Sequence, residues 1–282
     1  MTRADRGRLA DDWRAADDRR RALEDAERRW LETPPLVAEP DRRVQPLPPE
    51  MQTLLPAVTE HPVFRRAFAT VPARIALVEL DSLIAYQRTV NLSHVRRLRD
   101  RLGDDPTPRE LFQFCLPTER AAADLPPHRL RRVSDDEFVF TCESTDLRFL
   151  EAATLRPEQL TGYDAPGPVA GVVALAVGFG SNFLNVISTE GRQVLNNGNH
   201  RAYALRELGV THAPCVVQVV TRRDELKLVG GGRFRRDPDK YLRGPRPPML
   251  RDFFDPLLSR KVRLVRKTRH VRVSFTIEEE SI

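Results

Sequence analysis

The chain has 282 residues, of which 40% are apolar and 30% charged, and its formal net charge is +6. This length suits one large domain or two small ones, and the scattered cysteines form no CxxC pair, which excludes a disulfide framework and a cysteine-based zinc site. The basic excess fits nucleic acid or nucleotide phosphates as partners, although a solvated arginine-rich surface explains it equally well.

The N-terminus has no apolar core of a signal peptide, and the longest apolar stretch, residues 169–180, is much shorter than the roughly 20 residues of a membrane span. We therefore expect a soluble, cytoplasmic protein with no membrane partner.

The first 35 residues predict one long charged helix. Leu9, Ala16, Leu23 and Trp30 recur every seven residues within 8–32, and mixed-sign charges cover the rest. Such a thin apolar stripe favours packing on the same domain or on a second copy, so self-association through this helix is expected. The proline-rich segment that follows, 36–62, predicts a linker, because proline continues neither a helix nor a central strand.

A core of 63–229 is expected next, and it begins with a strand at 74–80. Asn91 or Ser93 can cap a helix that ends at Leu102 before Gly103. Residues 105–155 predict a β insertion, because "ELFQFCLP" and "HRLRRVSDDEFVFTCES" alternate and "SDDE" suits a hairpin turn.

The second half of the core predicts alternating strands and helices. The expected elements are a buried strand in "GVVALAVGF", a hairpin turning at Glu190-Gly191, a helix from His200 to Leu208 that ends at Gly209, a strand in "APCVVQVV" and a short helix in "RRDELKLV". Residues 230–282 predict a flexible basic loop, "GGGRFRRDPDKYLRGPRPP", and a C-terminal β element in which Val271, Val273, Phe275 and Ile277 share a face.

The junction "NNGNHR" between a strand and a helix predicts a phosphate site. The first amides of a helix lack intrahelical partners and the helix dipole favours an anion there. Gly198 allows a sharp turn, Asn199 suits the cap, and His200 and Arg201 can add charge-assisted hydrogen bonds. Asn196 and Asn197 can contact a ribose or order the turn. A simple capped turn explains the same residues.

These residues resemble the ParB/sulfiredoxin superfamily of ParB-like nuclease domains. The resemblance rests on Gly198, His200, Arg201 and Ala204, then Gly209 and an apolar strand, and on an earlier strand followed by Gln87 and Arg88. It covers roughly 74–104 and 168–229. It implies an α+β fold with a mixed sheet and short helices, here with a long N-terminal helix and a C-terminal β element, and it implies nucleotide or phosphate binding.

Other positions depart from the family pattern. Asn199 stands where sulfiredoxins carry the reactive cysteine, and residues 230–282 contain no recognisable helix-turn-helix. These departures disfavour sulfinic-acid reduction and a ParB-type DNA clamp.

We therefore expect a nucleotide-phosphate-binding protein, acting as a phosphotransferase or nucleotide hydrolase on ATP or CTP, with Mg²⁺ implied if ATP binds. The expected catalytic residues are His200 and Arg201, and the expected binding residues are Asn196, Asn197, Gly198, Asn199, His200, Arg201, Gln87 and Arg88, with Tyr86 beside them. Glu79, Asp81 and Glu190 are candidate bases. The alternatives are a non-catalytic regulator that binds nucleic acid or protein, and a ParB-like nuclease.

Overall fold

The computed structural model describes residues 44–118, 125–144, 146–162, 164, 167–180, 182–262 and 268–280, together with six positions between 18 and 29. Those six positions are helical. The remainder of the helix expected over 8–32 lies outside the described residues.

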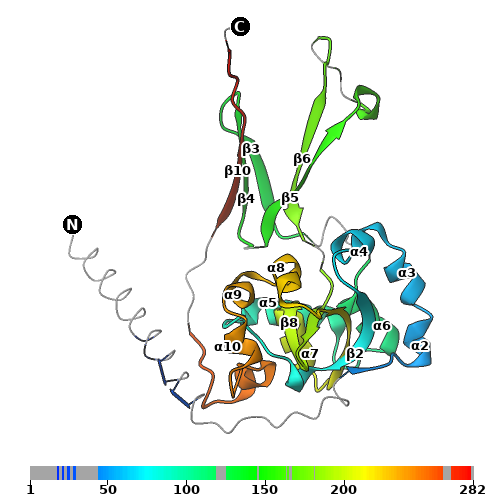
Figure 1. Ribbon diagram of the computed structural model, residues 1–282, viewed down its shortest axis with the longest axis vertical. Helices are drawn as coiled ribbons and strands as arrows, with labels where there is room; N and C mark the ends of the chain where they lie inside the picture. The colour runs from blue at the N-terminus through cyan, green and yellow to red at the C-terminus, as the bar shows by residue number, and fades with distance from the viewer. Residues whose placement is uncertain are drawn as a thin grey trace, which may run out of the picture. The chain divides into compact units, whose positions relative to one another are not determined.

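The described residues form two compact units. The first, called the core unit, contains the described residues of 44–118 and 182–262, and the second, called the β unit, contains those of 125–180 and 268–280. The chain is thus a mixed α+β protein (Figure 1). Of the expected insertion, 105–118 belongs to the core unit, and the described residues from 125 onward belong to the β unit.

A five-stranded sheet forms the centre of the core unit, with the strand order β1-β2-β9-β7-β8. Its strands are β1 (Val44–Gln45), β2 (Ala73–Glu79), β7 (Asn185–Thr189), β8 (Arg192–Asn197) and β9 (His212–Val219). Neighbouring strands are antiparallel, except that β7 and β9 are parallel. The expected hairpin, helix and strand from β7 to β9 are confirmed, and Glu190 and Gly191 both have positive φ at the turn, as a tight hairpin requires.

Helices and short 3-10 turns complete the core unit. They are α2 (Pro49–Gln52), α3 (Leu55–Thr59), α4 (Pro62–Ala67), η1 (Leu80–Ser82), α5 (Leu92–Leu102), α6 (Pro108–Cys115), α7 (Asn199–Glu207), η4 (Arg223–Glu225), α8 (Leu226–Val229), α9 (Gly232–Arg236), α10 (Asp239–Leu242) and η5 (Leu250–Phe254).

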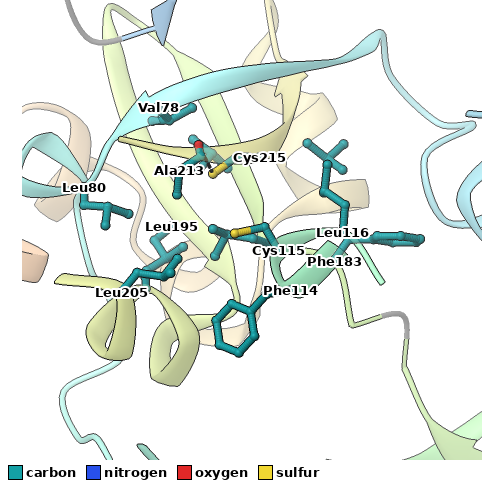
Figure 2. Packing of buried hydrophobic residues seen from close by; sticks show 14 of the residues in the cluster. Val78, Leu80, Phe114, Cys115, Leu116, Phe183, Leu195, Leu205, Ala213 and Cys215 are labelled. Atoms are coloured by element: carbon teal, nitrogen blue, oxygen red, sulfur yellow. Dashed lines mark hydrogen bonds between the residues drawn. The ribbon is translucent and has the colours of Figure 1, made fainter. Parts of the chain in front are cut away.

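Apolar side chains are buried on both faces of this sheet. Figure 2 shows one cluster, in which α6 and α7 contribute Phe114, Cys115 and Leu205 beneath strand residues such as Leu195 and Cys215. The opposite face packs on a second cluster that includes Val194, Phe234 and Tyr241. Strands buried on both faces carry continuous apolar runs, which explains "APCVVQVV".

The proline-rich segment differs from the expected linker. From Val44 onward it belongs to the core unit, and Leu47, Met51 and Val58 are buried. The prolines begin the helices α2 and α4 rather than breaking them, because proline fits the first helical turn, where its missing N–H has no intrahelical partner.

The prediction of a strand in "ELFQFCLP" was wrong. This segment is the helix α6, which starts with a capping box between Thr107 and Glu110. Phe112 and Cys115 reach the core from successive turns, so the apolar residues follow helical spacing rather than the alternation of a strand.

The β unit contains two small sheets. The first has the order β10-β4-β3, made of β3 (His128–Arg132), β4 (Glu137–Cys142) and β10 (Arg269–Ser274). The second pairs β5 (Leu147–Leu155) with β6 (Val172–Phe179), and η3 (Pro157–Gln159) follows β5. The expected "SDDE" turn and C-terminal strand are confirmed, whereas the strand in "GVVALAVGF" leaves Val173 and Leu175 exposed instead of buried.

Candidate functional site

A left-handed glycine connects β8 to α7. Gly198 has φ 92° and ψ 23°, and no side chain caps the helix at this position. A Cβ atom here would lie 2.5 Å from Leu184 Cδ1 and 3.3 Å from the Leu184 Cα. Both the backbone angle and the close approach therefore require glycine.

Two asparagines before the glycine hold neighbouring loops in place. Asn197 Nδ2 donates to the Phe183 carbonyl at 3.2 Å, and Asn197 Oδ1 accepts from the Gly198 N–H at 2.9 Å. Asn196 Nδ2 donates to Asn185 Oδ1 at 2.9 Å and to the Val229 carbonyl at 3.0 Å. These amides order the turn, which is one of the two roles expected for them.

Tyr86 and Gly231 meet at Asn196. The Tyr86 hydroxyl donates to the Asn196 carbonyl at 2.8 Å, and the Gly231 N–H donates to Asn196 Oδ1 at 3.1 Å. Burial, followed by the nearby Tyr241, raises the pKa of Tyr86 to about 12, so its hydroxyl remains a donor at neutral pH. A Cβ on Gly231 would lie 2.1 Å from the Tyr86 hydroxyl, so this glycine allows the loop to approach.

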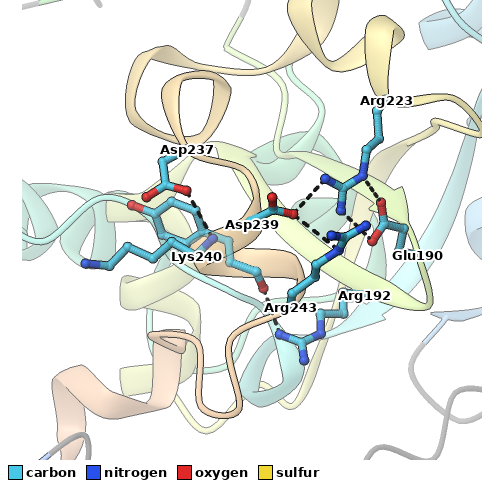
Figure 3. Close-up of polar contacts among 8 residues, drawn as sticks. Glu190, Arg192, Arg223, Asp237, Asp239, Lys240 and Arg243 are labelled. Atoms are coloured by element: carbon cyan, nitrogen blue, oxygen red, sulfur yellow. Dashed lines mark hydrogen bonds and ion pairs between the residues drawn. The ribbon is translucent and has the colours of Figure 1, made fainter.

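The segment expected as a flexible basic loop, 230–248, contains the short helices α9 and α10. Phe234, Tyr241 and Leu242 are buried against the sheet. Figure 3 shows the ion pairs that attach this segment to the β7–β8 turn: Arg223 contacts Glu190 Oε1 at 2.7 Å and Asp239 Oδ1 at 2.6 Å.

Two histidines face each other beside the junction. The ring centroids of His94, on α5, and His200, on α7, lie 5.1 Å apart with the rings nearly perpendicular. Burial, followed by the charge of His94, lowers the pKa of His200 to about 4, and burial together with Arg97, Arg201 and Arg101 lowers the pKa of His94. Both rings are therefore neutral at pH 7 and can each donate one hydrogen bond.

Arg201 points into the protein interior. Its side chain is only 3% exposed, and Nη1 donates to the carbonyls of Cys115, at 3.2 Å, and Asn182. The guanidinium also lies 5.4 Å from the centre of the Phe114 ring. These contacts give Arg201 a structural task, joining the end of α6 to the segment before β7, while its expected catalytic role stays a prediction.

The other expected residues surround the junction. Asn199 is 5% exposed, and its Oδ1 is buried without a hydrogen-bond partner among the described residues. Tyr86 contacts Asn196 and His94 contacts His200, so the segment between Tyr86 and His94 is fixed beside the junction at both ends. Gln87 donates within this segment to the Thr89 carbonyl, and Arg88 is exposed.

The candidate bases lie away from this junction. Asp81 pairs with Arg206 in the last turn of α7, Glu79 ends β2, and Glu190 pairs with Arg223 at the opposite end of β8. The described residues contain no group of three or more side chains suited to a metal ion. The Mg²⁺ expected with ATP stays a prediction.

Buried thiols do not add a nucleophile. Burial raises the pKa of Cys115 to about 12 and that of Cys215 well above its ordinary value, so both stay protonated in the core. Sequence reasoning missed His94 and Gly231. The "GGG" triplet was interpreted as part of a flexible loop, and only the fold reveals that Gly231 approaches Tyr86.

No protein-family model, curated protein or solved structure matched this chain. Within the described residues, every helix is too short or too polar to span a bilayer.

Proposed function

We propose that the first turn of α7 binds the phosphate of a nucleotide. The observation that carries this is the helix start itself: Gly198 is left-handed and provides no cap, whereas Asn91 caps α5 and Thr107 caps α6. The amides of Asn199 and His200, in the first turn, have no partner within the helix. Together with the helix dipole, they suit an anion.

The neighbouring residues support the same ligand. Neutral His200 can donate a hydrogen bond without placing a costly cation at the positive end of the helix. Arg88, exposed on the segment fixed between Tyr86 and His94, can supply the positive charge that the buried Arg201 does not bring to the surface.

The support is stronger for binding than for catalysis. No carboxylate contributes to the pKa shift of either histidine, and each of the three candidate bases has a place elsewhere in the core unit. A phosphotransferase or hydrolase would draw its base from another segment. We therefore propose a nucleotide-binding protein. An assay of nucleotide hydrolysis or phosphate transfer tests whether it is also an enzyme.

A thermal-shift panel of ATP, ADP, CTP and GTP, with and without magnesium, tests the binding site. A ligand at a hundredfold excess over its Kd should stabilise the protein by about 2.7 kcal/mol. We expect Arg88→Ala and His200→Gln to reduce the shift, while Arg65→Ala, at another exposed arginine, leaves it unchanged. Stabilisation of the wild type by none of the nucleotides would refute the site.

The histidines provide a second readout. A bound phosphate near His200 favours its charged form, so the pKa of His200 should rise when the nucleotide binds. NMR titration of the imidazole protons, with and without the nucleotide, measures this directly. An unchanged His200 titration in a saturated complex would place the nucleotide elsewhere.

Nucleic-acid binding is the second candidate, and one observation in the β unit favours it. Arg129 and Arg131 are both exposed at alternate positions of the edge strand β3. Arg131 is paired with Val139 of β4, which is paired in turn with Arg272 of β10. Alternate residues of a strand share a face. Replacing Arg129 and Arg131 with alanine should reduce the salt slope of DNA or RNA binding by about 2, whereas Arg132→Ala, on the opposite face, should not. No salt-dependent binding by the wild type would eliminate this candidate.

A further inference from the structure

A cavity of the core unit lies near the C-terminal end of α7. It has a volume of about 130 Å³ and is lined by Glu79, Asp81, Ser82, Ile84, Arg192, Gln193, Pro245, Pro247, Met249 and Arg251. Asp81 pairs with Arg206, seven residues after Asn199. At 1.5 Å per residue, this end of α7 lies roughly 10 Å along the helix from the proposed phosphate site.

The walls of the cavity are well fixed. Ile84 bridges β8 on one side, where Ile84 N donates to the Gln193 carbonyl and Leu195 N donates to the Ile84 carbonyl. On the other side it bridges Met249, where Ala85 N donates to the Pro248 carbonyl and Leu250 N donates to the Leu83 carbonyl. The loop that carries Pro245 to Arg251 is held by a buried ion pair between Arg246 and Asp252 at 2.7 Å. A site with such walls needs little ordering when a ligand enters.

The lining of the cavity combines apolar side chains with one incompletely hydrogen-bonded amide. Ile84, Pro247 and Met249 are buried, and Gln193 is 8% exposed. Gln193 Nε2 donates to Ser188 Oγ at 3.1 Å, and its Oε1 is buried without a partner among the described residues. Reversing the amide would leave the other end unpaired instead, because Ser188 contacts only one of them.

The lining of the cavity also includes acidic and basic side chains. Asp81 is engaged by Arg206 at 2.9 Å, and Arg192 donates to the carbonyls of Tyr241, at 2.8 Å, and Gly244, at 3.1 Å. The half-buried side chains of Glu79 and Arg251 form no hydrogen bond or ion pair within the described part of the chain. A carboxylate and a guanidinium without partners among the described residues therefore line one small cavity.

We propose that this cavity binds a small zwitterion of the α-amino acid class. The carboxylate of the ligand faces Arg251 and Arg192, and its ammonium faces Glu79. A cavity of about 150 Å³ holds benzene, so one of this size suits a ligand of roughly six to eight non-hydrogen atoms. Such a ligand would give the half-buried Glu79 carboxylate and the half-buried Arg251 guanidinium each a partner of opposite charge.

Isothermal titration with L-alanine, L-serine and L-threonine tests the class of ligand. At least one should bind, whereas its N-acetyl derivative, which lacks the ammonium, and its amide, which lacks the carboxylate, should each bind at least about tenfold more weakly. Equal binding of the free and blocked forms would overturn the assignment, as would the absence of binding by all three at concentrations on the order of 10 mM.

Matched variants locate the binding. Glu79→Gln and Arg251→Gln should each weaken it at least about tenfold, while Glu60→Gln and Arg65→Gln, at exposed positions, should not. Melting curves of each variant establish that it is folded. Undiminished amino acid binding in folded Glu79→Gln or Arg251→Gln would refute the site. Arg88→Ala should leave amino acid binding unchanged, which keeps this test independent of the proposed nucleotide site.

Discussion

Arg201 is a charged side chain that the fold holds in its interior. Its guanidinium donates to the Cys115 and Asn182 carbonyls. Arg201→Met keeps much of the apolar stem but leaves those carbonyls short of a donor, which typically costs about 1–3 kcal/mol. We expect that loss in the free energy of unfolding from urea titration, with little change from Arg88→Met, an exposed arginine. If the two variants were equally stable, the structural role of Arg201 would be rejected.

His200 makes the stability of the core unit depend on pH. Its folded pKa of about 4 lies below the ordinary value of 6.5. Below pH 6.5 the His200 side chain is therefore protonated in the unfolded chain but still neutral in the folded chain. The free energy of unfolding falls as the pH drops toward 4, by up to about 1.4 kcal/mol per pH unit.

His200→Gln removes this titration. The variant should lose less stability than the wild type between pH 6.5 and 4.5, as measured by urea unfolding at several pH values. His270→Gln, at an exposed strand position in the β unit, is the control and should follow the wild type. Parallel pH profiles for wild type and His200→Gln would show that His200 titrates normally.

At the scale of the element, α7 is bounded by two left-handed glycines that differ in their surroundings. Gly198 precedes the helix with φ 92°, and Gly209 follows it with φ 80°. A Cβ on Gly209 would meet nothing within 4 Å, whereas one on Gly198 would lie 2.5 Å from Leu184 Cδ1. Alanine at either position incurs backbone strain of about 1–2 kcal/mol. Only Gly198→Ala also forces Leu184 to move.

We therefore expect Gly198→Ala to destabilise the protein by at least about 1 kcal/mol more than Gly209→Ala. Thermal or urea unfolding of the two variants measures the difference. Equal losses of stability in the two variants would mean that the Leu184 side chain moves aside with no energetic penalty. The close contact between Gly198 and Leu184 would then not constrain the junction.

The elements with strong local rules were predictable. Asn91 capping α5, the Glu190-Gly191 turn and the Gly198–Gly209 frame of α7 follow from residue chemistry within a few positions. Errors occurred where tertiary burial decides. Phe234 and Tyr241 turn a basic, glycine-rich segment into ordered short helices only because the second face of the sheet is there to cover them.

The candidate site shows the same division. The residues of the strand-to-helix junction were foreseen because they are contiguous in the chain. Local rules could not assign the direction of Arg201 or the pairing of His94 with His200, since both depend on how α5 and α6 pack beside α7. The Glu79–Arg251 cavity joins positions far apart in sequence, so no local pattern announces it.

At the scale of the whole molecule, the two units differ in how much apolar surface they bury. In the core unit, Ala76, Val78, Cys215 and Val216 of the paired strands β2 and β9 are at most 3% exposed. In the β unit, Val173 is 68% exposed and Leu175 43% exposed, on a sheet of only two strands. Two-stranded sheets have marginal stability by themselves.

This contrast predicts the order of native-state hydrogen exchange. The amides of β9 should exchange at least about a hundredfold more slowly than those of β5 and β6, because opening the core strands exposes far more buried surface. Mass spectrometry of peptides from the two regions measures the rates. Leu147, at the start of β5, is 1% exposed. Because Leu147→Ala removes a buried apolar side chain, it should accelerate exchange in β5 and β6 further. If β5 and β6 were as protected as β9, their stability would have to come from contacts beyond the pairing and burial described for this sheet.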